Sequence, residues 1–387
     1  MKKRVLIKAP ILSQSGYGEH SRFIYRALKS REDLYDIYVE PLNWGRTGWI
    51  WEDTQERKDI DTCIGKFYHI LQSKMPNPFD IGIVVDLPNA WKRVAPFMIG
   101  VTAGVECDAV SPSWLQPSFD QVDEIIVPSN FSKDGFLNSI DKYRDAFDQE
   151  TLSKLSLLKE SIDDKISVVN YPVKEYEKLD LDLNFETDFN FLLVAQWGPR
   201  KNIQETIEAF YQEFANDADV GLVVKTSLAR NSIPDRFHAM KNLQQMKEEY
   251  SEAKCKVYLL HGEMTEDEMH SLYHHPKISA MINFGRGEGY GLPLFEAAYC
   301  GLPVITHAFG GQCDFLYAKK KDKNGKEKMR PFFTKVPFKQ KPVEATAVWE
   351  NIVEPDAEWA FVNIAGAKAA MRDMRVGYSY AVGRAKK

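Results

Sequence analysis

Short apolar runs alternate with longer polar or amphipathic segments in the first half of the chain. The apolar runs include residues 5–9, 36–40, 80–85 and 98–103, and an amphipathic segment at 21–28 lies between the first two. Runs of this length are typical of buried strands, and a helix between two of them makes a β-α-β unit. The pattern predicts a doubly wound α/β domain.

The same pattern returns in the second half. Apolar runs occupy residues 191–195, 220–224, 256–260 and 278–284, and the segment 203–214 is amphipathic with a helical period. Parallel strands buried on both faces have continuous apolar sequences of this kind. We therefore predict a second doubly wound sheet.

The domain boundaries follow from the breaks in these patterns. A chain of 387 residues is too long for one small core. We predict an α/β protein of two Rossmann-like domains, residues 1–173 and 189–364, joined by a charged linker at 174–188. Residues 365–387 have a helical pattern and are expected to pack back across the first domain.

The most informative stretch is MINFGRGEGYGLPLFEAAYCGLPVITHAFGGQCDFL, which begins at Met281. It predicts a strand, a glycine loop, a helix with Pro293 in its first turn, and a further strand. Free amides at a helix start beside glycines form an anion site. Glu296, expected in the first helical turn, could accept two ribose hydroxyls, and Glu288 in the loop could face a sugar. The alternative is an ordinary turn with an acidic residue that favours the helix N-terminus.

Basic residues follow two neighbouring strands of the second predicted sheet. Arg200 and Lys201 lie after the first strand, and Lys225 ends the next. Fixed positive charge at adjacent strand ends suits a diphosphate. The alternative is that these are ordinary surface cations.

A second glycine pair, Gly16-Tyr-Gly18, follows the first strand of the chain. Together with Glu40 at the end of the second strand, it suggests a dinucleotide site and an NAD-linked oxidoreductase. The third glycine of that motif is absent because Ser21 occupies its place, so the signal is weak.

EGYGLPLFEAAYCGLPVI resembles the Glu-x7-Glu motif of retaining GT-B glycosyltransferases in its spacing, glycines, proline and trailing Gly-x-Pro-Val-Ile. The resemblance implies a GT-B fold, two Rossmann-like domains facing a central cleft. It also implies transfer of a sugar from a nucleoside-diphosphate sugar with retention of anomeric configuration. We expect no cofactor and no metal, and a UDP-sugar rather than a GDP-sugar as donor.

The resemblance also implies roles for individual residues. The expected catalytic residues are Glu288, Glu106, Arg200 and Lys201. Many family members have a histidine where this chain offers Glu106, and a solvated loop acid is the alternative there. His261 has the alternative of a histidine at the edge of the core. The expected donor-binding residues are Gly16, Gly18, Lys225, Gly289, Tyr290, Gly291, Leu292, Glu296, His261 and Met264.

Charge and cysteine content add limits. The net charge is −5, with both signs intermixed, and no apolar run reaches membrane-spanning length. The five cysteines are scattered without a Cys-x-x-Cys pair, which favours reduced thiols in a cytoplasm and argues against structural zinc.

Lysines crowd residues 317–341, around a predicted hairpin turn at Asn324-Gly325. They could blunt an exposed sheet edge. They could instead bind an acidic acceptor. The sequence does not distinguish whether this acceptor is a glycan, a lipid, a protein or a nucleic acid. A non-catalytic sugar-nucleotide or nucleic-acid binding protein is a further alternative.

Overall fold

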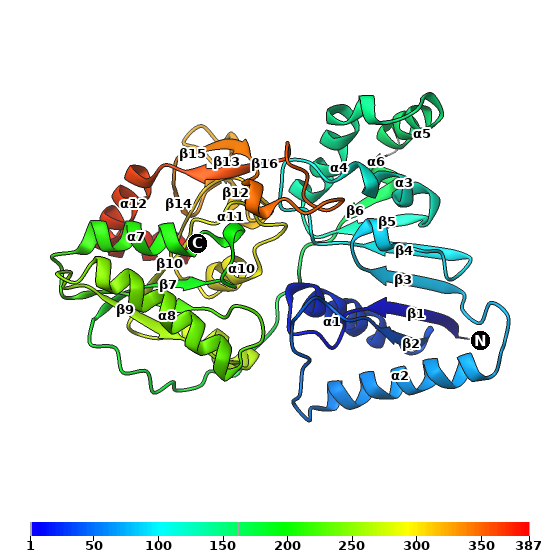
Figure 1. The fold of residues 1–387 in the computed structure, drawn as a ribbon, viewed down its shortest axis with the longest axis horizontal. Coiled ribbons are helices and arrows are strands. Elements are labelled where there is room, and N and C mark those ends of the chain that lie inside the picture. The colour runs from blue at the N-terminus through cyan, green and yellow to red at the C-terminus, as the bar shows by residue number, and fades with distance from the viewer. Residues whose placement is uncertain (1, 161, 387) are drawn as a thin grey trace. The chain divides into compact units, whose positions relative to one another are not determined.

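The computed structural model describes residues 2–160 and 162–386. The chain divides into two compact units, each with a six-stranded sheet (Figure 1). Unit 1 contains Met1–Pro172 and Val343–Ala357, and unit 2 contains Val173–Pro342 and Glu358–Lys387. In the part of the chain that is described, no helix combines the length and apolarity needed to cross a membrane.

The sheet of unit 1 is parallel throughout, in the order β2-β1-β3-β4-β5-β6. Its strands are β1 (Lys3–Ala9), β2 (Tyr35–Pro41), β3 (Ile81–Val85), β4 (Phe97–Val101), β5 (Glu124–Val127) and β6 (Ile166–Val168). Its helices are α1 (Gly16–Lys29), α2 (Gln55–Gln72), α3 (Pro112–Asp120), α4 (Asn130–Lys142), α5 (Gln149–Glu160) and α6 (Ile162–Lys165). Successive residues of β1 enter different apolar clusters, Val5 and Ile7 one and Leu6 another. Because strand side chains alternate between faces, this sheet is covered on both sides.

Helix α1 begins earlier than predicted. The amphipathic pattern predicted a helix over 21–28, but the helix starts at Gly16, with Ser15 as its N-cap accepting from the Gly18 amide. A β-carbon at Gly18 would lie 1.9 Å from the Ser13 carbonyl oxygen. The glycine there allows the helix to pack against the preceding loop.

The sheet of unit 2 is also parallel, in the order β14-β11-β10-β7-β8-β9. Its strands are β7 (Phe189–Val194), β8 (Val220–Lys225), β9 (Lys256–Leu260), β10 (Ile278–Asn283), β11 (Val304–Thr306) and β14 (Thr334–Lys335). Its helices are α7 (Ile203–Phe214), α8 (Ile233–Glu249), α9 (Glu266–Tyr273), α10 (Leu292–Tyr299), α11 (Cys313–Leu316), α12 (Ile364–Val376) and α13 (Tyr378–Ala385). Residues of β7 again divide between two clusters, Phe191 in one and Leu192 in the other.

Two small antiparallel ladders complete unit 2. They pair β12 (Tyr317–Lys321) with β13 (Glu327–Pro331), and β15 (Phe338–Pro342) with β16 (Glu358–Val362). The turn between β12 and β13 contains Gly325 at φ +76°. The hairpin predicted at Asn324-Gly325 is confirmed.

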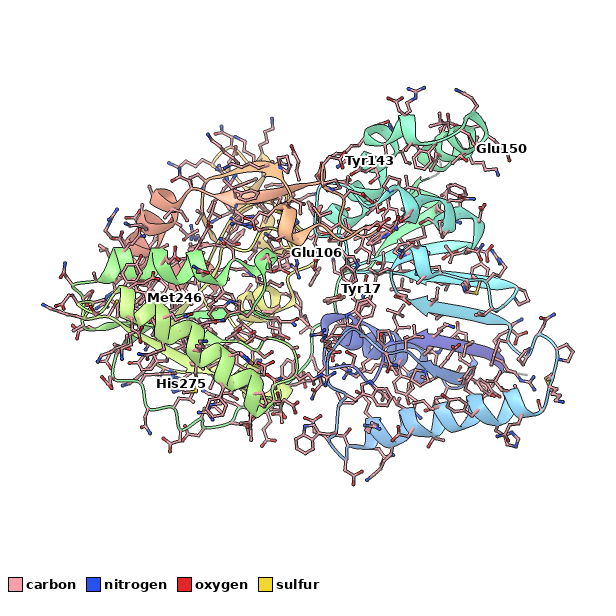
Figure 2. All side chains as sticks on the ribbon, in the orientation of Figure 1. Tyr17, Glu106, Tyr143, Glu150, Met246 and His275 are labelled. Atoms are coloured by element: carbon pink, nitrogen blue, oxygen red, sulfur yellow. The ribbon has the colours of Figure 1, made fainter. Side chains whose placement is uncertain are left out.

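The C-terminal helices belong to unit 2. We predicted that residues 365–387 pack across the first domain, but Met371 and Met374 of α12 lie in the same apolar cluster as Phe210 of α7. The segment 343–357 returns to unit 1 instead. There the carbonyl of Asn351 accepts from the Trp114 indole at 2.9 Å. Asp356 accepts from the hydroxyl of Tyr143, a residue labelled in Figure 2, at 3.0 Å.

Candidate functional site

The strand order of unit 2 fixes where a ligand would bind. Strands β8 and β9 follow β7 on one side, whereas β10, β11 and β14 lie on the other. The order therefore reverses between β7 and β10. In open α/β sheets, ligands bind outside the carboxyl ends of the strands at such a point. The loops at that position are residues 195–202, after β7, and 284–291, after β10.

These two loops are joined by hydrogen bonds. The side-chain amide of Asn202, at φ +51°, donates to the Phe284 carbonyl at 3.1 Å. The Arg286 amide donates to the Arg200 carbonyl at 2.6 Å, and the Arg200 guanidinium donates to the Gly287 carbonyl at 2.7 Å. Residues 195–202, which contain Arg200 and Lys201 (the cationic loop), and residues 284–291, which contain Glu288 (the acidic loop), are therefore joined into one structure.

Glu288 lies at the centre of this structure and is only 7% exposed. Its carboxylate is 2.5 Å from Lys201 Nζ and 3.4 Å from Arg200 Nη1. Burial alone would raise the pKa of Glu288. The charges of Lys201 and Arg200, with hydrogen bonds from Lys201 and Asn283, outweigh burial and lower that pKa to about 2. The site therefore holds an ionised carboxylate beside two cations.

Helix α10 begins directly after the acidic loop. Gly291 caps its start at φ +87°, a backbone conformation that favours glycine. The Gly311 amide donates to the Glu288 carbonyl at 2.8 Å, and a β-carbon at Gly311 would lie 2.0 Å from the Gly289 carbonyl oxygen. Gly311 thus allows a second loop to pack tightly on the acidic loop and fix its backbone ahead of the helix.

Glu296 lies farther along α10 than predicted. The helix starts at Leu292, so Glu296 occupies its second turn, and the first turn contains no acidic residue. One carboxylate oxygen of Glu296 accepts from the Tyr273 hydroxyl of α9 at 2.9 Å. The neighbouring helix therefore orients this carboxylate.

Two of the predicted donor-binding side chains, Tyr290 and Met264, pack against apolar neighbours. The Tyr290 ring is 4% exposed and lies beside Phe295 and Phe315, at 5.4 and 5.1 Å between ring centroids. Leu292 is the first residue of α10, and Met264 packs against an apolar cluster. Tyr290 can therefore approach a ligand in this conformation mainly through its backbone.

Lys225 and His261 are held at the next strands of the sheet. Lys225 Nζ donates to the Gly262 carbonyl, and His261 Nε2 lies 2.8 Å from Asp235. Burial acts to raise the pKa of Asp235, but hydrogen bonds from His261 and three backbone amides lower it to about 2. The His261 side chain is 3% exposed, which supports its interpretation as a histidine at the edge of the core.

In unit 1 the structure brings Glu106 close to Tyr17, which lies between Gly16 and Gly18; Figure 2 labels both side chains. The Tyr17 hydroxyl is 2.7 Å from Thr102 Oγ1. Burial, with a smaller contribution from the charge of Glu106, raises the pKa of Tyr17 well above its usual value. These residues lie after β1 and β4, and their binding roles stay predictions.

The dinucleotide interpretation loses support in unit 1. Glu40, which would bind a ribose, forms an ion pair with Lys8 of the neighbouring strand at 2.8 Å. The glycine pair lies inside the first turn of α1 and not in a loop before the helix.

His307 also belongs to this region, although no motif in the sequence marked it. It directly follows β11, is 1% exposed, and its Nε2 lies 2.5 Å from the Gly285 carbonyl oxygen. Burial lowers the pKa of His307 to about 4, so the ring is neutral near pH 7 and can donate to that carbonyl. The sequence feature that could have indicated its role is its position directly after β11, the strand that pairs with β10.

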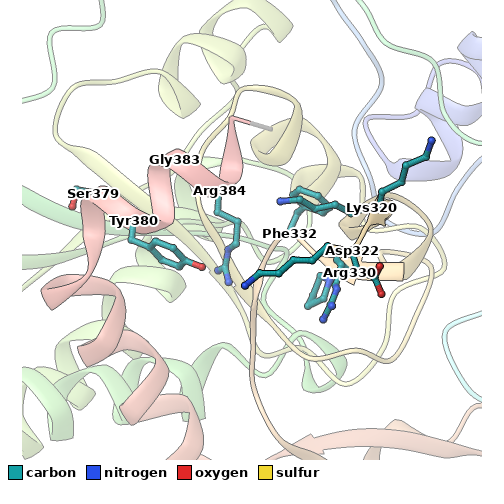
Figure 3. Close-up of a pocket in the computed structure, with 11 residues that line it drawn as sticks. Lys320, Asp322, Arg330, Phe332, Ser379, Tyr380, Gly383 and Arg384 are labelled. Atoms are coloured by element: carbon teal, nitrogen blue, oxygen red, sulfur yellow. The ribbon is translucent and has the colours of Figure 1, made fainter. Parts of the chain in front are cut away.

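The lysine hairpin borders a cavity of about 670 Å³, shown in Figure 3. The cationic residues of the hairpin that line it are Lys320, Lys321, Lys323 and Arg330, and α13 adds Arg384. Asp322, which also lines it, accepts hydrogen bonds from backbone amides of the turn. Cations therefore outnumber acids around this cavity.

The comparisons with known proteins agree with this picture. Residues 177–325 match the model of the family described as glycosyl transferases group 1. The matched range contains Arg200, Lys201, Glu288 and Glu296. No curated protein matches the chain by sequence.

Among solved structures, sucrose-phosphate synthase from Thermosynechococcus elongatus has a TM-score of 0.57 at 12% identity, covering 100% of this chain and 92% of that one. HepE from Anabaena, solved with UDP and glucose, has a TM-score of 0.48 at 11% identity, covering 81% and 82%. The first similarity shows a shared fold. The protein has the two Rossmann-like α/β domains of GT-B glycosyltransferases, as predicted, and the family match supports glycosyl transfer.

The buried ion pairs of Glu288 lead to a prediction about acid stability. Its carboxyl takes up a proton near pH 4.5 when the chain is unfolded but only near pH 2 when folded. Its stabilising contribution is therefore complete above about pH 4.5 and is lost as the pH falls towards 2. Lowering the pH from about 6 to 3 should remove on the order of 2 kcal/mol from the free energy of unfolding of the wild type. Glu288→Gln has no carboxyl at this position and should not show this loss.

Urea unfolding of both proteins across this pH range measures the difference. Glu252→Gln, at an exposed position, is the control and should follow the wild type. A gap between wild type and Glu288→Gln that does not narrow on acidification would show that Glu288 is not held ionised by its partners.

Proposed function

We propose that the protein transfers a sugar from a nucleoside-diphosphate sugar to an acceptor hydroxyl with retention of anomeric configuration. The observation that carries this proposal is the meeting of Arg200, Lys201 and Glu288 where the strand order of unit 2 reverses, beside the start of α10. The match of residues 177–325 to a glycosyltransferase family supports it.

In this proposal the two cations hold the donor diphosphate. Arg200 and Lys201 exchange part of their contact with Glu288 for contact with phosphate oxygens, and the amides at the start of α10 add donors. As the bond between the anomeric carbon and the diphosphate breaks, the same groups stabilise the charge that develops on the leaving group. The acceptor oxygen bonds to the anomeric carbon on the face that the diphosphate leaves, and its proton passes to the departing phosphate.

The glutamates bind the remaining parts of the donor. Glu288, which gives up part of its contact with Arg200 and Lys201, accepts hydrogen bonds from sugar hydroxyls. Glu296 accepts hydrogen bonds from the ribose hydroxyls, and the Tyr273 hydroxyl keeps its carboxylate oriented. Lys225 and the backbone around His261 flank the nucleotide. Gly16, Gly18 and Glu106 of unit 1 serve the sugar.

We also propose that donor binding requires no metal ion, because Arg200 and Lys201 provide the positive charge that a divalent cation would otherwise supply. The proposed donor is a UDP-sugar in preference to a GDP-sugar. UDP should then bind equally well to EDTA-dialysed protein with and without added Mg²⁺, as calorimetry can measure.

A turnover experiment tests the proposed function. Purified protein is incubated with UDP-, GDP- and ADP-sugars, and released nucleoside diphosphate is measured with and without candidate acceptors. One donor class should be consumed, and proton NMR of the product should show the anomeric configuration of the donor. Inverted configuration would contradict retention, and nicotinamide oxidation without donor turnover would favour an oxidoreductase.

Glu296→Gln belongs in the same experiment. A neutral amide replaces a charged acceptor of two hydroxyls, so the donor KM should rise by about tenfold to a hundredfold. Tyr273→Phe, which frees the carboxylate but keeps its charge, should have a smaller effect. An unchanged KM for Glu296→Gln would remove this residue from the ribose site.

The cavity in Figure 3 gives a prediction about the acceptor. If an acidic acceptor docks there, the double change Lys321→Glu and Lys323→Glu should raise the acceptor KM several-fold and leave the donor KM unchanged. Added salt should reduce the difference, because exposed charges are screened over about 10 Å at ~0.1 M ionic strength.

The same hairpin offers a matched control. Lys319 and Lys326 do not line the cavity, so reversing both changes the net charge equally without touching the proposed surface. Equal effects of the two double variants, or none, would favour the alternative in which the lysines only blunt an exposed edge.

A further inference from the structure

Three metal-ligating side chains meet at the far end of α9 and α10. His270 and His274 lie four residues apart, one turn of helix, and Cys300 caps the end of α10. Their ligating atoms all lie within 4.8 Å of one another, and His270 Nδ1 is 3.4 Å from Cys300 Sγ. The two helices thus bring together two imidazoles and a thiol from separate parts of the sequence.

We propose that His270, His274 and Cys300 form a binding site for a zinc-like transition-metal ion. Zinc binds imidazole nitrogen at about 2.0–2.1 Å and thiolate sulfur at about 2.3 Å, so tetrahedral ligands lie roughly 3.3–3.8 Å apart. The separation of His270 Nδ1 from Cys300 Sγ already falls in this range, and the remaining ligand atoms would have to approach by up to about 1.5 Å. Nitrogen and sulfur donors select against Mg²⁺ and Ca²⁺, which require oxygen.

The surroundings suit such a site. The Tyr176 ring stacks on His270, with centroids 4.7 Å apart and an angle of 24° between the rings, and so limits the rotation of that imidazole. His274 is exposed, whereas His270 and Cys300 are half-buried. An ion can therefore enter from solvent at His274 and reach the other two ligands.

The proton balance of binding is simple. The ion forms bonds to two imidazole nitrogens and to Cys300 Sγ, and the thiol proton passes to solvent. Three protein ligands leave a fourth tetrahedral position, which water fills. A histidine pair on one helix face and a distant cysteine do not form a Cys-x-x-Cys motif, so the sequence pattern did not indicate this site.

Binding would link the two helices beside a proposed donor contact. Tyr273 precedes His274 on α9 and holds Glu296 on α10 through its hydroxyl. A metal that joins α9 to α10 would restrict the motion of this pair. That consequence rests on the proposed function, whereas metal binding itself does not.

Metal titration of the nucleotide-free protein tests the site. After dialysis against EDTA and its removal, the protein is titrated with Zn²⁺ by calorimetry and with Co²⁺ by absorbance. We expect one equivalent to bind, with the visible bands of tetrahedral Co²⁺ and a thiolate-to-cobalt charge-transfer band. Octahedral cobalt without the charge-transfer band, or no saturable binding, would overturn the proposal.

Variants locate the ligands. His274→Asn and Cys300→Ser should each weaken Zn²⁺ binding by about 100-fold or more, and Cys300→Ser should remove the charge-transfer band. His238→Asn, an exposed histidine on α8, should bind as the wild type does. Since His274 is exposed, its variant should keep the wild-type circular dichroism. Wild-type affinity in both ligand variants would contradict the assignment.

Discussion

The ionised state of a buried carboxylate is the constraint on which the candidate site depends. Glu288 is almost enclosed by protein, and an isolated charge there would be strongly disfavoured. Ion pairs with Lys201 and Arg200 stabilise the charge of Glu288, and both cations lie in the loop after β7, whereas Glu288 lies in the loop after β10. Folding must therefore bring the ends of β7 and β10 together before the site exists.

The parallel sheet provides that meeting. Strands β7 and β10 are neighbours in unit 2 although almost ninety residues separate them, and the strand order reverses at this point. The side-chain amide of Asn202 and the backbone amide of Arg286 then tie the two loops together by donating to backbone carbonyls. In the proposed function the donor diphosphate and Glu288 use Lys201 and Arg200 in turn, because a diphosphate offers oxygens much like those of a carboxylate. In that proposal the ion pairs with Glu288 hold Lys201 and Arg200 in place before the donor binds, which reduces the reorganisation required on binding.

The sequence predicted features that depend on local pattern. Apolar runs located the strands, the spacing of Glu288 from Glu296 indicated the α10 region, and Asn324-Gly325 marked a real turn. Contacts between segments far apart in the sequence could not be predicted from local pattern. The start of α1 depends on Ser15 and on the closeness of Gly18 to Ser13. The segment 343–357 lies in unit 1, where the Trp114 indole donates a hydrogen bond to the Asn351 carbonyl.

The site shows the same division. Arg200 and Lys201 could be placed after a strand, but no local pattern showed that both reach Glu288. His307 was overlooked because a histidine after a strand has no distinctive motif. The second-turn position of Glu296 follows from the start of α10 at Leu292, directly after the left-handed Gly291, which spacing alone did not determine.

The most direct test of the central claim compares a nucleoside diphosphate with its nucleoside. Calorimetry would measure both with wild type and Lys201→Met, and Lys241→Met, at an exposed position of α8, is the control. Loss of a charged contact to phosphate should weaken diphosphate binding by about tenfold or more and leave nucleoside binding unchanged. Equal weakening of both ligands, or no weakening of the diphosphate, would contradict the account.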